Sequence, residues 1–155
     1  MADRRSGALA YLDANVFIEL VEGALELVEQ ASALLRIGQG RDGLFATSEL
    51  TLAEVLAGAK VSPRERRLYM NLIVWSPAIT LVPVSRYILT ETADLRKYTS
   101  HKLPDAIHVV SALRQNCRFI VSRDKDMKKL PAGMISRLDI GPEAVRVLED
   151  ALNDL

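Results

Sequence analysis

The sequence has little of several features that mark special classes of protein. Its single cysteine, Cys117, can neither close a disulfide within the chain nor build a cysteine zinc site, and a reducing compartment fits it best. Lysine plus arginine and aspartate plus glutamate each number 20, so no global positive field attracts nucleic acid. Aromatic residues make up only 5%, which leaves few platforms for stacking single-stranded bases. Any nucleic-acid target would therefore be recognised mainly through its shape and backbone.

Long apolar runs are also missing. No stretch approaches the ~18 consecutive apolar residues that cross a bilayer. Asp13 and Glu19 interrupt the segment behind the N-terminal arginines, which argues against a secretory signal. What is present is ordinary, because 155 residues with 49% hydrophobic and 26% charged side chains are typical of one soluble domain. We therefore expect a cytoplasmic protein with no membrane association, folded as a single domain over 1–155.

Short apolar runs alternate along the chain with longer segments of helical period. Strands are expected at residues 8–12, 44–47, 79–84, 118–121 and 135–140. Helices are expected at residues 16–22, 24–37, 52–59, 63–75, 85–98, 104–113 and 142–152. Strands separated by helices imply crossover connections and a mainly parallel sheet covered on both faces. The prediction is a three-layer α/β/α domain with a core at about 9–140 and a C-terminal helical extension over 141–155.

Four carboxylates come where these elements begin or end. Asp13 and Asp124 follow expected strands, whereas Glu54 and Asp105 lie early in expected helices. Ligands of parallel sheets bind beyond the carboxyl ends of the strands, so the four acids could converge on one rim. Carboxylates a few ångström apart raise one another's pKa, and a divalent cation removes that cost. Oxygen ligands without paired His or Cys favour Mg²⁺ or Mn²⁺, and the chemistry this indicates is phosphodiester hydrolysis.

These acids also have purely structural interpretations. Asp13 could simply cap the helix that follows it, and Asp124 could be an ordinary turn residue. Thr51 and Glu54 have the spacing of a capping box, in which the Glu54 carboxylate only satisfies backbone N–H groups. If the helix instead begins near Ser48, Glu54 lies in its interior and its carboxylate is free for a metal. The pattern leaves both alternatives open.

Three other residues invite a prediction. His108 comes one turn after Asp105 and could face the same rim. We interpret it instead as a partly buried helix residue with a satisfied hydrogen bond, and not as a metal ligand. His101 lies in a polar connection and is expected to be solvated. Trp75 lies at a helix end and is expected to pack in the core.

Four short segments, in their order along the chain, resemble the acidic motifs of PIN-domain ribonucleases. They are Leu12-Asp13-Ala14-Asn15, Leu52-Ala53-Glu54-Val55, Leu103-Pro104-Asp105-Ala106-Ile107-His108 and Val121-Ser122-Arg123-Asp124-Lys125-Asp126. The similarity spans roughly residues 9–140 and is closest to VapC-type toxins of toxin–antitoxin pairs. One departure is Met127, where members of the family usually carry an aromatic residue.

The resemblance implies an endoribonuclease that depends on Mg²⁺ or Mn²⁺. It implies that the acids of the four motifs form the catalytic metal site, namely Asp13, Glu54, Asp105 and Asp124. Asp126 would be an auxiliary or alternative ligand, and Asn15 and Ser122 match polar positions that support the site. The resemblance also implies a homodimer and inhibition by a small antitoxin protein encoded beside the toxin.

Basic residues flank the fourth acid on both sides. They are Arg123, Lys125, Lys128 and Lys129. A charge run is usually only a solvated surface. Here we expect contacts with the phosphate backbone of RNA, because the resemblance puts these residues beside the metal site.

Two other functions compete with the ribonuclease. A phosphatase of the haloacid-dehalogenase type also has an aspartate after its first strand, but it needs a second one two residues later, where this chain has Asn15. A non-catalytic PIN-like adaptor would use the same fold to bind protein. The presence of all four acids argues against the adaptor.

Overall fold

The chain alternates strands and helices in a computed structural model that describes residues 7–58, 60–128, 130 and 133–155. Within these residues five strands form one sheet: β1 (Ala10–Leu12), β2 (Phe45–Ser48), β3 (Ile79–Val82), β4 (Phe119–Val121) and β5 (Ser136–Leu138). The spatial order is β3-β2-β1-β4-β5, and each neighbouring pair is parallel. The predicted parallel α/β architecture is therefore confirmed.

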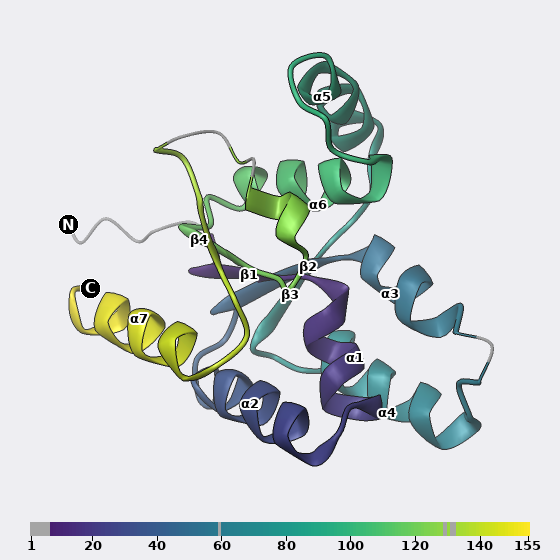
Figure 1. The fold of residues 1–155 in the computed structure, drawn as a ribbon, viewed down its shortest axis with the longest axis vertical. Helices are drawn as coiled ribbons and strands as arrows, with labels where there is room; N and C mark the ends of the chain where they lie inside the picture. The colour runs from purple at the N-terminus through teal and green to yellow at the C-terminus, as the bar shows by residue number, and fades with distance from the viewer. Residues whose placement is uncertain (1–6, 59, 129, 131–132) are drawn as a thin grey trace.

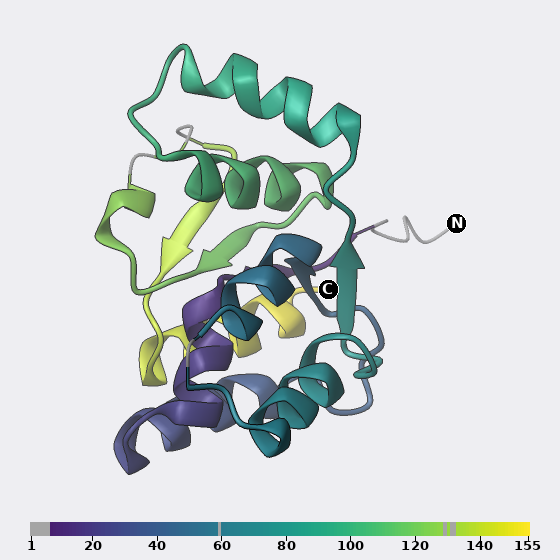
Figure 2. The ribbon, with the colours of Figure 1, turned by 90° about the vertical axis from the view of Figure 1, so that its right-hand side faces the viewer.

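Helices cover both faces of this sheet. The helices of the described part are α1 (Ala14–Glu22), α2 (Leu25–Arg36), α3 (Glu49–Leu56), α4 (Pro63–Ile73), α5 (Arg86–Arg96), α6 (Leu103–Arg114) and α7 (Pro142–Asn153), with the 3-10 turn η1 (Lys125–Lys128). In Figure 1, α5 and α6 lie above the sheet, and α1, α2, α4 and α7 lie below it. Figure 2 shows the same layers from the side. None of the helices in the described ranges is long and apolar enough to cross a membrane.

The alternation of side chains in β1 divides the core into two parts. Ala10 and Leu12 point to the face covered by α1 and α2, and Tyr11 points to the opposite face, under α6. All three are fully buried. Helix α7 lies in the predicted C-terminal extension, and its Ala144, Leu148 and Ala151 are buried in the first of these two clusters. Tyr11 is thus directed toward the helix that carries Asp105 and His108.

The start of α3 decides between the two interpretations of Glu54. The helix begins after Ser48, whose Oγ accepts the N–H of Leu50 at 3.0 Å. Glu54 therefore lies in the second turn, and the capping box considered for Thr51 and Glu54 is not formed. The predicted end of this helix at residue 59 lies outside the described residues.

Two minor expectations about burial are wrong. Trp75 is 63% exposed and lies two residues beyond Ile73, where α4 ends. His101 is only 4% exposed, and its carbonyl oxygen accepts from Arg96 Nε at 3.3 Å. His101 is therefore buried within a connection whose Tyr98 and Lys102 are exposed.

Candidate metal centre

The site lies at the carboxyl ends of β1 and β4, where the strand order reverses. The chain proceeds from β1 to β2 and β3 on one side, and it then returns to the other side of β1 to form β4 and β5. Connections diverge at such a switch point and leave a crevice for ligands. Asp13 directly follows β1, and Ser122 and Asp124 follow β4. The sheet topology thus brings together residues more than 100 positions apart.

Asp13 is held by several hydrogen-bond donors at once. Its Oδ1 accepts the N–H of Ala14 at 2.7 Å, which caps α1. Its Oδ2 accepts from Ser122 Oγ at 2.6 Å and from Asn15 Nδ2 at 3.4 Å. The side chain is 9% exposed, so little water reaches it. Asp13 is therefore both a helix cap and a site carboxylate, and Asn15 and Ser122 contact the residue that they were predicted to support.

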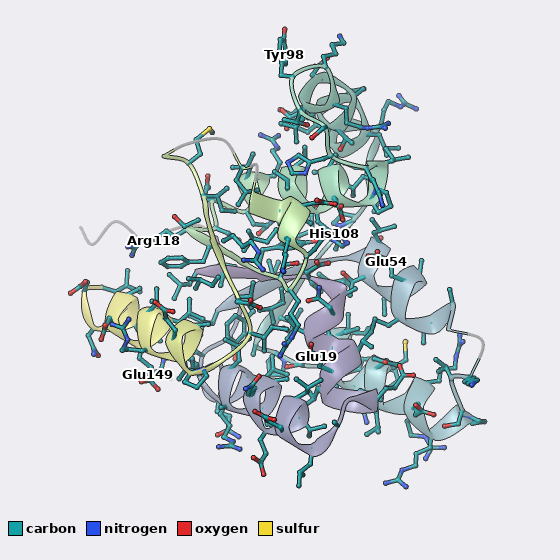
Figure 3. The ribbon with its side chains drawn as sticks, viewed as in Figure 1. Glu19, Glu54, Tyr98, His108, Arg118 and Glu149 are labelled. Carbon is teal, nitrogen blue, oxygen red and sulfur yellow. The ribbon has the colours of Figure 1, made fainter. Side chains whose placement is uncertain are left out.

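Glu54 reaches the same place from α3. Its Oε1 lies 2.5 Å from Nε2 of His108, and Asp13 Oδ1 lies 3.6 Å from that same nitrogen. The Glu54 side chain is 32% exposed. One ligand atom from each of Asp13, Glu54 and His108 lies within 4.8 Å of the others, which makes the three a candidate metal-binding group among the described residues. Figure 3 shows Glu54 and His108 meeting from α3 and α6.

Asp105 and Asp124 form a second acidic pair beside Asp13. Burial raises the pKa of Asp105 to about 6, and the negative charges of Asp124 and Asp13 add to this effect. A hydrogen bond between the two side chains favours the protonated form of Asp105 further. The structure thus brings all four predicted acids to one rim, at an electrostatic cost that a cation would remove.

The loop that carries Asp124 is fixed by its neighbours. The N–H of Asp124 donates to Ser122 Oγ at 3.0 Å, and its carbonyl oxygen accepts from Arg137 Nε at 3.1 Å. Its Oδ1 accepts the backbone N–H of Asp126 at 2.9 Å. Asp126 itself is exposed on η1, so its role as an auxiliary ligand stays a prediction.

His108 and Tyr11 belong to the site although the sequence argument did not place them there. His108 is fully buried, and its hydrogen bonds are satisfied, as predicted. Burial by itself would lower the pKa of His108, but the hydrogen bond to Glu54 and the charge of Asp13 raise it above its ordinary value. The one available signal was the three-residue spacing from Asp105, which puts both side chains on one face of α6.

The basic residues near Asp124 do not form one exposed group. The Arg123 guanidinium makes an ion pair with Glu19 of α1, and its Nη2 donates to Gln30 of α2 at 3.0 Å. Burial raises the pKa of Glu19, although the positive charge of Arg123 opposes that shift. Arg123 therefore connects the β4 loop to α1 and α2 within the protein.

The remaining basic side chains are described only in part. Lys125 is exposed at the start of η1, beside Asp124. The side chain of Lys128 and the whole of Lys129 lie outside the described residues. Contacts of these lysines with RNA stay predictions, as does the predicted contact of Arg123.

The donor set fits a divalent cation. Several carboxylates share a partly buried rim, and carboxylate oxygens are the ligands that Mg²⁺ and Mn²⁺ prefer. Burial and the nearby charges of Asp124 and Asp13 raise the pKa of Asp105, and a bound cation would offset this cost of ionisation. Asp13, Glu54 and Asp105 would hold the cation, and Asp124 would add negative charge beside it.

The contribution of Asp105 to the stability of the protein in EDTA should fall as pH rises from about 4 to about 6. The folded-state pKa of Asp105, about 6, lies above its ordinary value of 3.8, so the folded protein binds the proton more tightly than the unfolded chain in that window. Stability from this group is present below pH 4 and is lost as the proton leaves. Thermal unfolding at a series of pH values should show this slope, and Asp105→Asn should flatten it. Equal slopes for the two proteins would contradict the assignment.

The fold and site define an α/β protein with a carboxylate-rich centre at the switch point of a parallel sheet. The profile of the PIN domain matches residues 10–133, which is most of the chain. The chain belongs to the PIN domain family. A comparison with curated proteins finds no match.

Solved structures with the same fold include components of toxin–antitoxin systems. A chain from a toxin–antitoxin complex of Klebsiella pneumoniae is 28% identical, with a TM-score of 0.60 over 79% of this chain and 92% of that chain. A chain of VapBC2 from Rickettsia felis, bound to a promoter DNA fragment, is 15% identical with a TM-score of 0.61, covering 84% and 97%. VapC20 from Mycobacterium tuberculosis, a sarcin–ricin loop cleaving toxin, is 13% identical with a TM-score of 0.62, covering 81% and 96%. The latter two similarities concern the fold alone.

Proposed function

We propose that this chain is an endoribonuclease that depends on Mg²⁺ or Mn²⁺ and acts as the toxin of a toxin–antitoxin pair. The observation that carries the proposal is the convergence of acids from four separate segments on one rim: Asp13, Glu54, Asp105 and Asp124. A purely structural role would not need so many like charges in one place, because each raises the cost of ionising the next. The fold shared with VapC20, a toxin that cleaves the sarcin–ricin loop, supports RNA as the substrate.

In this proposal the acids bind the cation together. Asp13, Glu54 and Asp105 are its ligands, Asp124 assists directly or through water, and Asp126 is auxiliary. When bound, a divalent cation makes water easier to deprotonate and neutralises charge on the phosphoryl oxygens. The donors from Ala14, Asn15 and Ser122 hold the Asp13 carboxylate in one orientation, so little reorganisation is needed.

Other features of the proposal concern the proton on Asp105 and the side chains that would contact the RNA backbone. Below about pH 6 Asp105 carries a proton in the cation-free protein, and that proton must leave before Asp105 can serve as a ligand. Lys125, exposed beside Asp124, is proposed to contact an RNA phosphate, together with Lys128 and Lys129. Arg123 is proposed to hold the loop that follows β4 in place through its ion pair with Glu19.

The toxin assignment brings further proposals about partners and location. A small cognate antitoxin is proposed as the inhibitor, since the structures of similar fold include VapBC2 and a toxin–antitoxin complex. A homodimer and a cytoplasmic location are proposed from the resemblance to VapC-type toxins. The segment 141–155, which contains α7, is proposed to belong to the same domain because α7 contributes buried side chains to the core.

The proposed activity predicts cleavage of RNA that requires a divalent cation. End-labelled RNA incubated with the purified chain should be cut in Mg²⁺ or Mn²⁺ and left intact in EDTA, with 5′-phosphate and 3′-hydroxyl ends on the products. Excess EDTA followed by fresh Mn²⁺ should restore cleavage, which separates cation removal from damage to the protein. A folded protein that binds the cation but leaves every RNA intact would contradict the ribonuclease and favour the adaptor.

A further inference from the structure

A buried chain of hydrogen bonds connects the centre of the sheet to Glu54. Tyr11 Oη of β1 lies 2.5 Å from Nδ1 of His108, and Nε2 of the same ring lies 2.5 Å from Glu54 Oε1. Tyr11 and His108 are fully buried, and their rings are in tilted contact with centroids 5.6 Å apart. Three residues on β1, α6 and α3, far apart in sequence, are thus joined by two hydrogen bonds that end at a proposed ligand, Glu54.

We propose that His108 is a positioning residue that fixes the Glu54 carboxylate for the cation, and that Tyr11 in turn fixes the His108 ring. This inference rests on the proposed function, since it assigns the group that prepares one ligand of that site. A metal ligand is oriented by hydrogen bonds from the residues behind it, and losing such a bond weakens metal binding. Asp13 has this support from three donors, whereas Glu54 receives it from His108.

The location of the hydrogen between the two side chains indicates that His108 donates to Glu54. An ionised carboxylate only accepts hydrogen bonds, so the hydrogen between Glu54 and His108 must sit on Nε2. When the ring is neutral, Nδ1 then has a lone pair, which accepts from the Tyr11 hydroxyl. When the ring is charged, Nδ1–H donates to the Tyr11 oxygen instead. In both states Nε2–H faces Glu54, so the orientation of the carboxylate does not depend on titration of the ring.

The contact distance also separates a positioning role from a ligand role. Two adjacent ligands of a cation with bonds of about 2.1 Å stand about 3 Å apart in octahedral geometry. Glu54 Oε1 and His108 Nε2 are closer than that, at a distance typical of a charge-assisted hydrogen bond. A nitrogen that carries this hydrogen has no lone pair left for a metal. His108 therefore acts on the cation through Glu54.

Removing one hydroxyl tests the chain of hydrogen bonds with little change in packing. Tyr11→Phe should weaken Mn²⁺ binding to the purified protein about 10-fold, measured by calorimetry without RNA. The matched control is Tyr69→Phe, because Tyr69 is also buried and its hydroxyl donates to a carboxylate, Glu22, outside the site. The control should bind Mn²⁺ as the wild type does. Unchanged affinity in Tyr11→Phe would overturn the proposal.

Substitutions of His108 test the second hydrogen bond. His108→Phe should lower Mn²⁺ affinity up to about 100-fold. His108→Gln, whose amide can still donate to Glu54, should recover part of that loss. Pulsed EPR of the wild-type Mn²⁺ complex should show no coupling to an imidazole nitrogen. Such a coupling would overturn the proposal, because it would make His108 itself a ligand.

Measurements of Mn²⁺ binding also distinguish a failure of this inference from a failure of the proposed function. If Asp13→Asn binds Mn²⁺ with wild-type affinity, the cation site itself is wrong and the role of His108 fails with it. If Asp13→Asn loses binding while Tyr11→Phe retains it, the cation site stands and only the positioning role is overturned. Unfolding curves for each variant show whether a loss of affinity comes from a folded protein.

Discussion

Asp13→Asn should lower the rate of RNA cleavage about 10³-fold while leaving the protein folded. Asparagine is also a good helix cap, and its amide oxygen can still accept from Ala14, while its NH2 group takes the place of the second oxygen, which accepted from Ser122. The variant therefore loses one negative charge and one acceptor oxygen at the centre of the proposed cation site. A cation contributes several kcal/mol to stabilising charge in the transition state, and about 4 kcal/mol corresponds to 10³-fold in rate. Single-turnover cleavage of labelled RNA in Mn²⁺ measures the effect.

Asp94→Asn is the matched control for this substitution. Asp94 is an exposed acid on α5 that pairs with Lys97 at 3.3 Å, away from the site. It changes the net charge by the same amount and should cleave RNA at the wild-type rate. Cleavage by Asp13→Asn at a rate near that of Asp94→Asn would show that Asp13 only caps α1.

Asp105→Asn should have opposite effects on activity and on stability. The variant removes a ligand of the proposed site, so its cleavage rate should fall by a similar factor of about 10³. In EDTA at pH 8, however, it should be more stable than the wild type, because asparagine avoids both the burial of a charged carboxylate and its repulsion by Asp124 and Asp13. We expect a gain of about 1 kcal/mol, after allowance for screening by water at this partly exposed carboxyl. Urea unfolding measures it.

The gain in stability of Asp105→Asn over the wild type should depend on pH. At pH 3 Asp105 is protonated in the folded protein and largely so in the unfolded chain, so the wild type and the variant should be nearly equal in stability. Saturating Mn²⁺ at pH 8 should reverse the order, since only the wild type has the full ligand set. The control is Asp150→Asn on α7, an exposed acid 3.9 Å from Arg146, which should change stability little in any condition. A destabilised Asp105→Asn in EDTA at pH 8 would contradict the electrostatic account.

The elements of the fold could be predicted where their signals are local. Pro63 and Pro104 stand in the first turns of α4 and α6, and Pro142 opens α7. The short apolar runs became the five strands of the sheet, of which β1 and β2 are fully buried and β5 is only partly buried. The start of α3 was the ambiguous case, since Ser48 and Thr51 can both cap a helix. Only the observed cap at Ser48 shows where α3 begins. It also shows that the Glu54 carboxylate is not used in a capping box.

The partners of the site residues could not be predicted in the same way. Arg123 is predicted to contact an RNA phosphate because it stands next to Asp124 in the sequence, and nothing in the sequence predicts its partner within the protein. In the fold it pairs with Glu19, more than 100 residues away, because α1 passes beside the β4 loop. His108 looked like an ordinary buried residue because its two hydrogen-bond partners, Tyr11 and Glu54, lie 97 and 54 positions away. No local pattern carries that information.

The amino-acid order alone determined the alternation of strands and helices and the positions of Asp13, Asp105 and Asp124 at the ends or starts of elements. Those properties depend on periodicity, proline and capping groups, which act over a few residues. Only the tertiary structure decided which element ends meet. The order β3-β2-β1-β4-β5 puts β1 beside β4, so that Asp13 meets Ser122, and α6 packs over Tyr11, so that His108 meets Glu54. Such contacts arise from burying two faces of one sheet, a constraint on the whole chain at once.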